Sequence, residues 1–171
     1  MNKKIFELFA RYNKKVNEKM NEIIRSLSEE EWDKSFPGYY KSIHGLCSHI
    51  FGADNRWLKR FKTIREFKSL RDKRFDSEYG FNELFFKNIT EYLTERTELD
   101  TIMVNFVNEL KEEDLGKMFT WANNQGIELT RTLGTTLAHV FNHETSHRGM
   151  ISLYLESLGK ENDFTNLYLY E

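Results

Sequence analysis

Apolar side chains recur every third or fourth residue in long stretches of this chain, which is the period of an amphipathic α-helix. The first stretch covers residues 5–27 and is followed by Ser28-Glu29-Glu30-Glu31, a capping-box pattern that predicts a short further turn around Trp32. The segment Phe36-Pro37-Gly38 then breaks the pattern. After it, residues 43–61 repeat the helical period. We therefore predict two long helices in the first third of the chain, joined by a short helical turn.

Two further stretches show the same helical period. Residues 85–110 carry apolar side chains at nearly heptad spacing, from Phe85 to Leu110. Residues 132–158 begin at Thr132, a residue suited to an N-cap, and are followed by Gly159, a residue suited to ending a helix. With the first two, these stretches predict four long helices.

The connections between the later helices are long. Residues 62–79 are charged and lack a clear period, and the period also changes between residues 111 and 131. Two short segments there, Met118-Phe119-Thr120-Trp121 and Ile127-Glu128-Leu129-Thr130, flank the turn-forming Asn123-Asn124-Gln125-Gly126 and predict a β-hairpin. We predict an all-α fold in a single domain, residues 1–171: a four-helix bundle with long crossover connections and a small β-hairpin before the last helix.

Composition narrows the possible functions. The 171-residue chain is 39% hydrophobic and 30% charged with a formal net charge of −2, which is typical of a globular protein and gives no broad basic field for nucleic acid or an anionic membrane. Cys47 is the only cysteine, so the chain has no internal disulfide. No apolar run approaches the ~20 residues of a membrane span or the ~7–15 of a signal peptide core. We expect a cytoplasmic protein.

Three of the five histidines recur every fourth residue in the last predicted helix: His139, His143 and His147. Side chains at i and i+4 lie on one helical face, so two such imidazoles can reach one metal ion. On a helical wheel His147 lies roughly 40° from the centre of the apolar face, His143 roughly 80° and His139 roughly 120°. We predict His143 and His147 as metal ligands, and His139 as a group beside the site or at its mouth.

A third ligand must come from elsewhere in the chain. The second predicted helix offers His44 and His49, neither of which lies on its main apolar stripe. His49 shares its face with Gly45, Gly52 and Ala53, small residues that let a neighbouring helix come close. The wheel alone leaves both histidines open as ligands.

The same segment admits a different interpretation. His143-Glu144-Thr145-Ser146-His147 spells His-Glu-x-x-His, the motif of zinc hydrolases in which the glutamate is the general base. The motif is short, and the sequence shows no sheet upstream of this helix of the kind that such hydrolases have. Glu144 therefore stays an alternative general base for a metal-dependent hydrolase.

Two segments resemble a known family. Residues 139–149, His-Val-Phe-Asn-His-Glu-Thr-Ser-His-Arg-Gly, resemble the hallmark segment of the DinB-like (DinB/YfiT) superfamily. Upstream, Ser42-Ile43, Leu46, His49-Ile50 and Trp57-Leu58 are similar to the second-helix pattern of that family. The two segments occur in the expected order, and the predicted helices agree over nearly the whole chain.

The resemblance implies a four-helix bundle, often a homodimer, with a metal ion held by three histidines, here His49, His143 and His147. It thereby selects His49 rather than His44. Characterised members of the superfamily include metal-dependent enzymes that use low-molecular-weight thiols. Since ligand imidazoles must be neutral, we expect such a metal to be released as the pH falls below ~6.

Two departures from the family pattern concern specificity rather than the ligands. Met150 stands where the family usually has glutamine, and Ser146 stands where many members have a further histidine. Three imidazoles suit zinc, nickel or iron. Our preferred interpretation is a metal-dependent transferase that activates a small thiol. The alternatives are a metal-binding stress or interaction protein without enzymatic turnover, and the hydrolase that uses Glu144.

Overall fold

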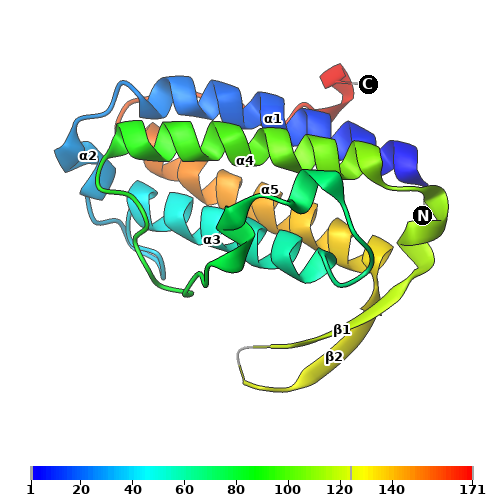
Figure 1. Ribbon diagram of the computed structural model, residues 1–171. Coiled ribbons are helices and arrows are strands. Elements are labelled where there is room, and N and C mark those ends of the chain that lie inside the picture. Colours follow the sequence, from blue (N-terminus) through cyan, green and yellow to red (C-terminus); the bar gives the residue numbers. More distant parts are fainter. Residues whose placement is uncertain (1, 124, 171) are drawn as a thin grey trace.

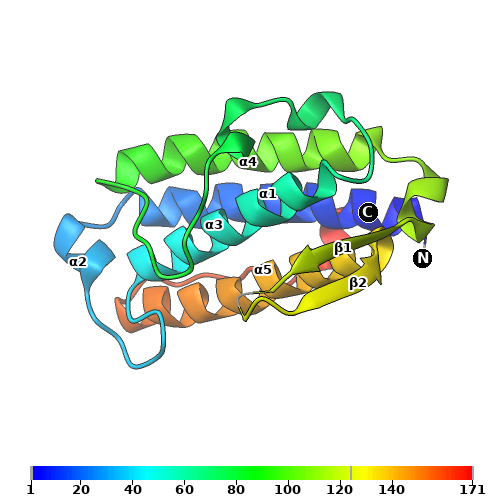
Figure 2. The ribbon, with the colours of Figure 1, turned by 60° about the horizontal axis from the view of Figure 1, so that its bottom comes forward.

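Four long helices form a bundle in the computed structural model, which describes residues 2–123 and 125–170. They are α1 (Lys3–Ile24), α3 (Ile43–Phe61), α4 (Ile89–Glu109) and α5 (Leu133–Ser157) (Figures 1 and 2). A short helix, α2 (Glu29–Asp33), lies between the first two at one end of the bundle. The predicted four-helix architecture is confirmed.

The ends of these helices follow the predicted capping residues. The Ser28 hydroxyl accepts a hydrogen bond from the Glu31 amide at 3.1 Å, and the Glu31 carboxylate accepts one from the Ser28 amide at 2.8 Å, which completes the capping box of α2. Thr132 caps α5 by accepting from the Thr135 amide at 3.2 Å. Gly159 follows α5 with a φ of +74°, a conformation that glycine adopts without strain.

The start of α4 is the long-helix boundary that the sequence misplaces most. The apolar pattern predicts a helix from Phe85, but Asn88 caps α4 by accepting from the Glu91 amide at 2.9 Å. Phe85 and Phe86 precede the helix, and both pack against the ring of Phe51 on α3. Their apolar character reflects packing of a loop against α3, which the helical period cannot distinguish from a first helical turn.

Helices α3 and α4 run parallel, and this explains the longest connection. Asp54 pairs with Arg96 near the middle of the two helices, and Phe61 stacks on Phe106 at their carboxyl-terminal ends. The chain must therefore return along the whole bundle between them, as residues 62–88 do in Figures 1 and 2. This crossover contains two single-turn helices, η1 (Lys68–Leu70) and η2 (Lys73–Asp76).

The predicted hairpin is also present. Strands β1 (Met118–Ala122) and β2 (Glu128–Thr132) pair antiparallel after a short helical segment, η3 (Glu112–Gly116). In the turn, Gly126 has a φ of +75° and its amide donates to the Asn123 carbonyl at 3.0 Å. Asn124, part of the predicted turn, lies outside the described residues. The hairpin projects from the bundle beside the end of α3 and the start of α5 (Figure 2).

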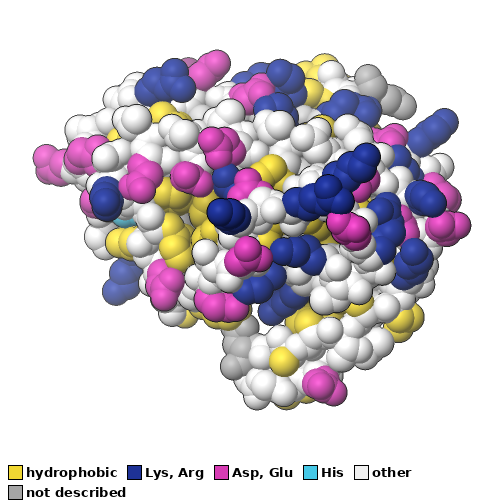
Figure 3. Space-filling model, in the orientation of Figure 1, with side chains coloured by type: hydrophobic (Ala, Val, Ile, Leu, Met, Phe, Trp, Pro, Cys, Tyr) yellow, Lys and Arg dark blue, Asp and Glu magenta, His cyan; other side chains and the backbone are white. Residues whose placement is uncertain are grey.

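Charged side chains of both signs lie next to one another on the surface shown in Figure 3. Arg74 of η2, for example, pairs with Glu95 and Glu98 of α4 at 3.3 and 2.6 Å. The crossover is thus attached to α4 by ion pairs as well as by buried rings. No helix among the described residues has a stretch long and apolar enough to cross a bilayer.

The interior contains charged groups as well as apolar ones. Arg96 of α4 donates to Asp54 of α3 and to Asp100 of α4, both at 2.6 Å, and each of these side chains is at most 2% exposed. Asn17 of α1 donates to Asp100 at 2.9 Å. A single guanidinium group therefore connects α3, α4 and, through Asp100 and Asn17, α1.

A second buried guanidinium group extends this cluster to α5. Arg148 donates to Glu144 at 3.3 Å and to the side-chain oxygens of Asn13 and Asn17 on α1. The buried Glu144 carboxyl also lies near the Asp54 carboxyl of α3, whose charge contributes to raising the pKa of Glu144. The buried charged cluster thus comprises Asn13, Asn17, Asp54, Arg96, Asp100, Glu144 and Arg148, with at least one member on each long helix.

The strongly raised pKa of Glu144 indicates that this carboxyl holds the proton that balances the cluster. Three carboxyl groups (Asp54, Asp100, Glu144) face two guanidinium groups (Arg96, Arg148). Burial and then the charge of Asp54 raise the pKa of Glu144 well above its ordinary value. One oxygen of Asp54 and one of Glu144 have no hydrogen-bond partner among the described residues. A proton on Glu144 satisfies both oxygens and leaves two negative charges for two positive ones.

Removal of Arg96 should therefore be far more costly than neutralisation of Glu144. We expect Arg96→Met to lower the free energy of unfolding by ~3–5 kcal/mol, because two carboxylates stay buried without their cation. Glu144→Gln should cost much less, since an amide replaces a carboxyl that is already neutral. Guanidinium chloride unfolding of the metal-free proteins measures both. Equal losses would show that Glu144 is ionised.

Candidate metal centre

Helices α3 and α5 bring three histidines together. Their antiparallel packing places His49 of α3 opposite His143 and His147 of α5, which lie one turn apart. One ring nitrogen from each of the three lies within 4.8 Å of the other two. The structure thus groups the three histidines that the resemblance selects, whereas the wheel alone had left His44 and His49 open.

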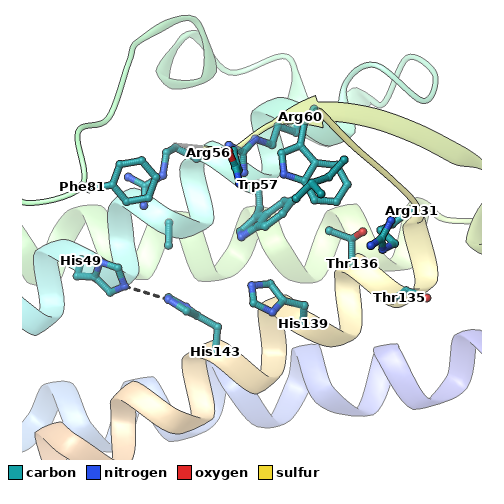
Figure 4. A pocket seen from close by; sticks show the side chains of 14 residues that line it. His49, Arg56, Trp57, Arg60, Phe81, Arg131, Thr135, Thr136, His139 and His143 are labelled. Carbon is teal, nitrogen blue, oxygen red and sulfur yellow. Dashed lines mark hydrogen bonds between the residues drawn. The ribbon is translucent and has the colours of Figure 1, made fainter. Parts of the chain in front are cut away.

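The three imidazoles are close enough to bind one metal ion together. The Nε2 atoms of His49 and His143 are 2.9 Å apart, as the dashed line in Figure 4 shows. The ring of His147 lies 4.4 Å from that of His143 and 4.7 Å from that of His49, measured between centroids. Two Nε2 atoms at this distance cannot both carry hydrogen, so at least one presents its lone pair to the space between them.

Burial favours the neutral form of all three imidazoles. Burial lowers the pKa of His49 to about 4 and that of His143 to about 3, and in both cases the charge of a neighbouring histidine lowers it further. Burial also lowers the pKa of His147. Neutral imidazole is the form that binds a metal ion, so the donor set and its protonation both fit a divalent cation.

Tyr40 is a fourth polar group at this site, and the sequence did not indicate it. Its hydroxyl lies 3.0 Å from Nε2 of His49, and its ring contacts the rings of His49 and His147. Gly45 is what allows this approach: a Cβ there would lie 2.3 Å from the Tyr40 carbonyl oxygen. Lys41, the next residue, has a φ of +57° in the turn that positions the tyrosine.

The small residues around His49 therefore have a different role from the one predicted. We expected them to admit a neighbouring helix. Instead Gly45 admits the backbone of Tyr40, and Gly52 admits the ring of Phe85, which would lie 2.7 Å from an added Cβ. Both contacts come from connecting segments rather than from α5.

The other two histidines lie outside the cluster. His44 is buried, its Nδ1 lies 2.8 Å from the Asp33 carboxylate, and its ring stacks on Trp32 at 5.0 Å. His139 is exposed one turn before His143 and contacts the ring of Trp57. His139 thus lies beside the site, as the wheel predicts, while His44 joins α3 to α2.

Glu144 does not face the three histidines. Its side chain is fully buried on the core side of α5, between Arg148 and Asp54. A general base for metal-assisted hydrolysis must reach the attacking water. The chain therefore contains the His-Glu-x-x-His motif, but its glutamate does not lie where a hydrolase of this kind needs its general base.

A cavity of about 390 Å³ opens beside His49 and His143. Its wall comes from α3, from the crossover, from the hairpin and from the first turns of α5 (Figure 4). The cavity-lining side chains are His49, Ala53, Arg56, Trp57, Arg60, Phe81, Trp121, Asn123, Leu129, Arg131, Thr135, Thr136, His139 and His143. The histidine cluster thus forms one end of an accessible ligand-sized space.

Sequence reasoning identified the histidines of this cavity but none of its other functional candidates. Arg56 and Arg60 follow His49 by two and three helical turns, so their position on the same side of α3 was open to a wheel calculation. Tyr40, Phe81 and Trp121 come from connecting segments, whose approach to α3 has no periodic signal.

The comparison with known proteins agrees with this geometry. The family model described as "DinB family" matches residues 1–171. The Bacillus subtilis (strain 168) protein named "Protein DinB" is 26% identical to this chain over 165 residues, which cover 96% of this chain and 92% of that protein. The match includes the helices that carry all three clustered histidines. The chain belongs to the DinB family.

Proposed function

We propose that this protein is a metal-dependent transferase that uses a small thiol, with a divalent ion held by His49, His143 and His147. The observation that carries the proposal is the cluster itself: three imidazole nitrogens within 4.8 Å of one another at one end of a cavity. The superfamily resemblance supports a thiol as the nucleophile.

The donor set suits a catalytic rather than a purely structural ion. Three protein ligands leave at least one coordination position for a small molecule, whereas structural zinc sites use four. Three neutral imidazoles suit zinc, nickel or iron. Such an ion, when bound, acts as a Lewis acid. It lowers the pKa of a coordinated thiol, so that the thiol is deprotonated at neutral pH.

The chain's own groups prepare the site for this chemistry. The Tyr40 hydroxyl, 3.0 Å from His49 Nε2, is placed to donate a hydrogen bond to a sulfur or leaving group at the site. No carboxylate lines the cavity among the described residues, so the thiol proton passes to water or to the imidazole of His139, which lines the cavity. The sulfur then forms a bond to an electrophilic carbon, and the leaving group departs with the electron pair of the broken bond.

The ligand assignment is testable with five single His→Ala variants. Changes at His49, His143 or His147 should weaken metal binding by several orders of magnitude, since each removes a ligand. His139→Ala should cost at most ~10–100-fold, as expected for a group beside the ligands, and His44→Ala should leave affinity unchanged. Titration of zinc and nickel into each metal-free protein, with circular dichroism as the folding control, measures this. Retention of the ion by His143→Ala together with its loss from His139→Ala would refute the assignment.

Metal binding should also persist to lower pH than ordinary histidines allow. Protons compete with the ion only below the ordinary histidine range, because the folded-state pKa is about 4 for His49 and about 3 for His143 and is also lowered for His147. Affinity should therefore change little between pH 7 and ~5 and fall below that, rather than at the ~6 expected from the unperturbed value. Competition titrations across this range, on protein shown to remain folded, provide the measurement. Release already at pH 6 would indicate well-hydrated histidines.

The same pKa shifts predict how the metal-free protein responds to acid. Unfolded histidines bind protons near pH 6.5, but the folded ones resist protonation until well below it. Stability should thus decrease as the pH falls below ~6.5. The urea midpoint should decrease less steeply in His143→Gln, which removes one such group. A slope identical to that of the unaltered protein would show that His143 titrates normally when folded.

Activity separates the transferase from its alternatives. With metal loaded, L-cysteine or glutathione and 1-chloro-2,4-dinitrobenzene should give the thioether and chloride faster than the uncatalysed reaction. His147→Ala should abolish the enhancement, while Glu144→Gln should retain most of it. Normal metal binding without rate enhancement for any thiol tested would favour the non-enzymatic metal-binding protein. Hydrolytic activity that Glu144→Gln abolishes would favour the hydrolase.

A further inference from the structure

Three arginines line the cavity beyond the histidines. Arg56 and Arg60 lie one turn apart on α3, and Arg131 lies across the cavity on β2. Figure 4 shows Arg56 and Arg60 on the side opposite His139 and His143, with Arg131 near the start of α5. The cavity therefore has two of the clustered histidines at one end and three positively charged side chains further along its wall.

These positive charges have no carboxylate partners. None of the ion pairs among the described residues includes Arg56, Arg60 or Arg131, and no Asp or Glu is among the described cavity-lining residues. Arg56 donates through Nη1 to the carbonyls of Tyr79 and Gly80 at 2.9 and 3.0 Å. Arg60 donates only to the Ala122 carbonyl, at 3.4 Å.

The guanidinium groups keep donors free for a ligand. A guanidinium group has five N–H donors, and the hydrogen bonds above use few of them. Both groups are held in place by aromatic rings, Arg56 over Phe81 at 4.0 Å and Arg60 over Trp57 at 4.6 Å. A positioned arginine with unused donors suits a planar or tetrahedral anion.

Part of the remaining cavity wall is apolar. The rings of Trp57 and Trp121 meet edge to face at 5.2 Å, and Leu129 and Ala53 complete this side. A volume of about 390 Å³ accommodates a small molecule rather than a peptide or an oligonucleotide. The wall thus offers an apolar contact surface between the arginines and the histidines.

We propose that this cavity is a binding site for a small ligand with a flat apolar body and an anionic headgroup, which Arg60 and Arg56 bind while the body packs on Trp57 and Trp121. The headgroup is a carboxylate, a phosphonate or phosphate, or a sulfonate, since each accepts hydrogen bonds from guanidinium. This inference deepens the proposed function and rests on it for the ligand's role: the molecule is the electrophilic co-substrate, with its reactive end toward His49 and His143.

Intrinsic fluorescence tests binding directly, because two of the three tryptophans line the cavity and Trp32 is buried elsewhere. The probes are 4-phenylbutanoate and 4-phenylbutylphosphonate, with 4-phenylbutanamide and 4-phenylbutylamine as neutral and cationic counterparts. At least one anionic probe should saturate the signal, and the amide should bind about tenfold or more weakly. The tighter of the two anions identifies the headgroup class.

Two arginine variants locate the site. Arg60→Gln should weaken binding of the anionic probe about tenfold or more and leave the amide unaffected. Arg11→Gln, at an exposed position on α1 outside the cavity, is the matched control and should change neither. Arg60 is preferred to Arg56 because Arg56 also fixes the carbonyls of Tyr79 and Gly80, so its loss would alter the cavity wall.

The outcome is independent of whether a metal binds. The titrations are carried out on chelator-treated protein and repeated with His147→Ala, because His147 belongs to the histidine cluster but does not line the cavity. If metal binding and transferase activity fail while anionic probes still bind, only the proposed function is refuted. Equal binding of the amide or amine, an unchanged affinity in Arg60→Gln, or no saturable binding of either anion at millimolar concentration would overturn the site proposal.

Discussion

The ion pair between Arg96 and Asp54 is the interaction on which the arrangement of this bundle depends. A buried charge is stable only where its partner lies next to it, because an unpaired charge in the core is very costly. Apolar side chains can pack in many alternative arrangements of similar free energy. Arg96 sets α4 against α3, and the carboxyl of Glu144, in contact with Asp54, sets α5 against α3. A shift of one helical turn would leave a charge unpaired between α3 and α4, and it would separate two buried carboxyl groups that share a proton between α3 and α5.

That constraint also determines where the histidines meet. His49 lies five residues before Asp54, and His143 directly precedes Glu144. The contact between Asp54 and Glu144 therefore fixes the height of α3 against α5 at which His49 faces His143 and His147. The core side of the two helices carries the charges and the other side carries the neutral imidazoles. The site is organised by residues that never touch it.

The sequence predicts the helices and the common face of His143 and His147 because both follow local rules. The i, i+4 spacing of His143 and His147 and the caps at Ser28 and Thr132 need no knowledge of distant segments. The helical pattern does not reveal which charged residues are buried, because long-range partners decide this. Asp54 and Glu144 are both fully buried, with Asp54 paired to Arg96 and Glu144 beside Arg148. A search for apolar residues alone therefore misses the part of the core that is formed by buried ion pairs.

The cavity was unpredictable for a related reason. Its arginines lie on a helix, but its aromatic wall comes from the crossover and the hairpin, whose packing on α3 is set by contacts far apart in the chain. Phe81 and Trp121 are thus brought to Arg56 and Trp57 by tertiary structure alone. Phe85, read as part of a helix, packs instead into the space that Gly52 leaves.

The parallel course of α3 and α4 has an evolutionary consequence. Because the chain must return along the whole bundle between them, residues 62–88 form a long segment outside the four-helix framework, and the hairpin is a second one. One side of the cavity is built from these two segments, while the histidines stand on helices locked by buried charges. Substitutions or changes of length in the segments can therefore alter which molecules enter the cavity without disturbing the three imidazoles, so that a single framework can diversify its ligands while its chemistry stays constant.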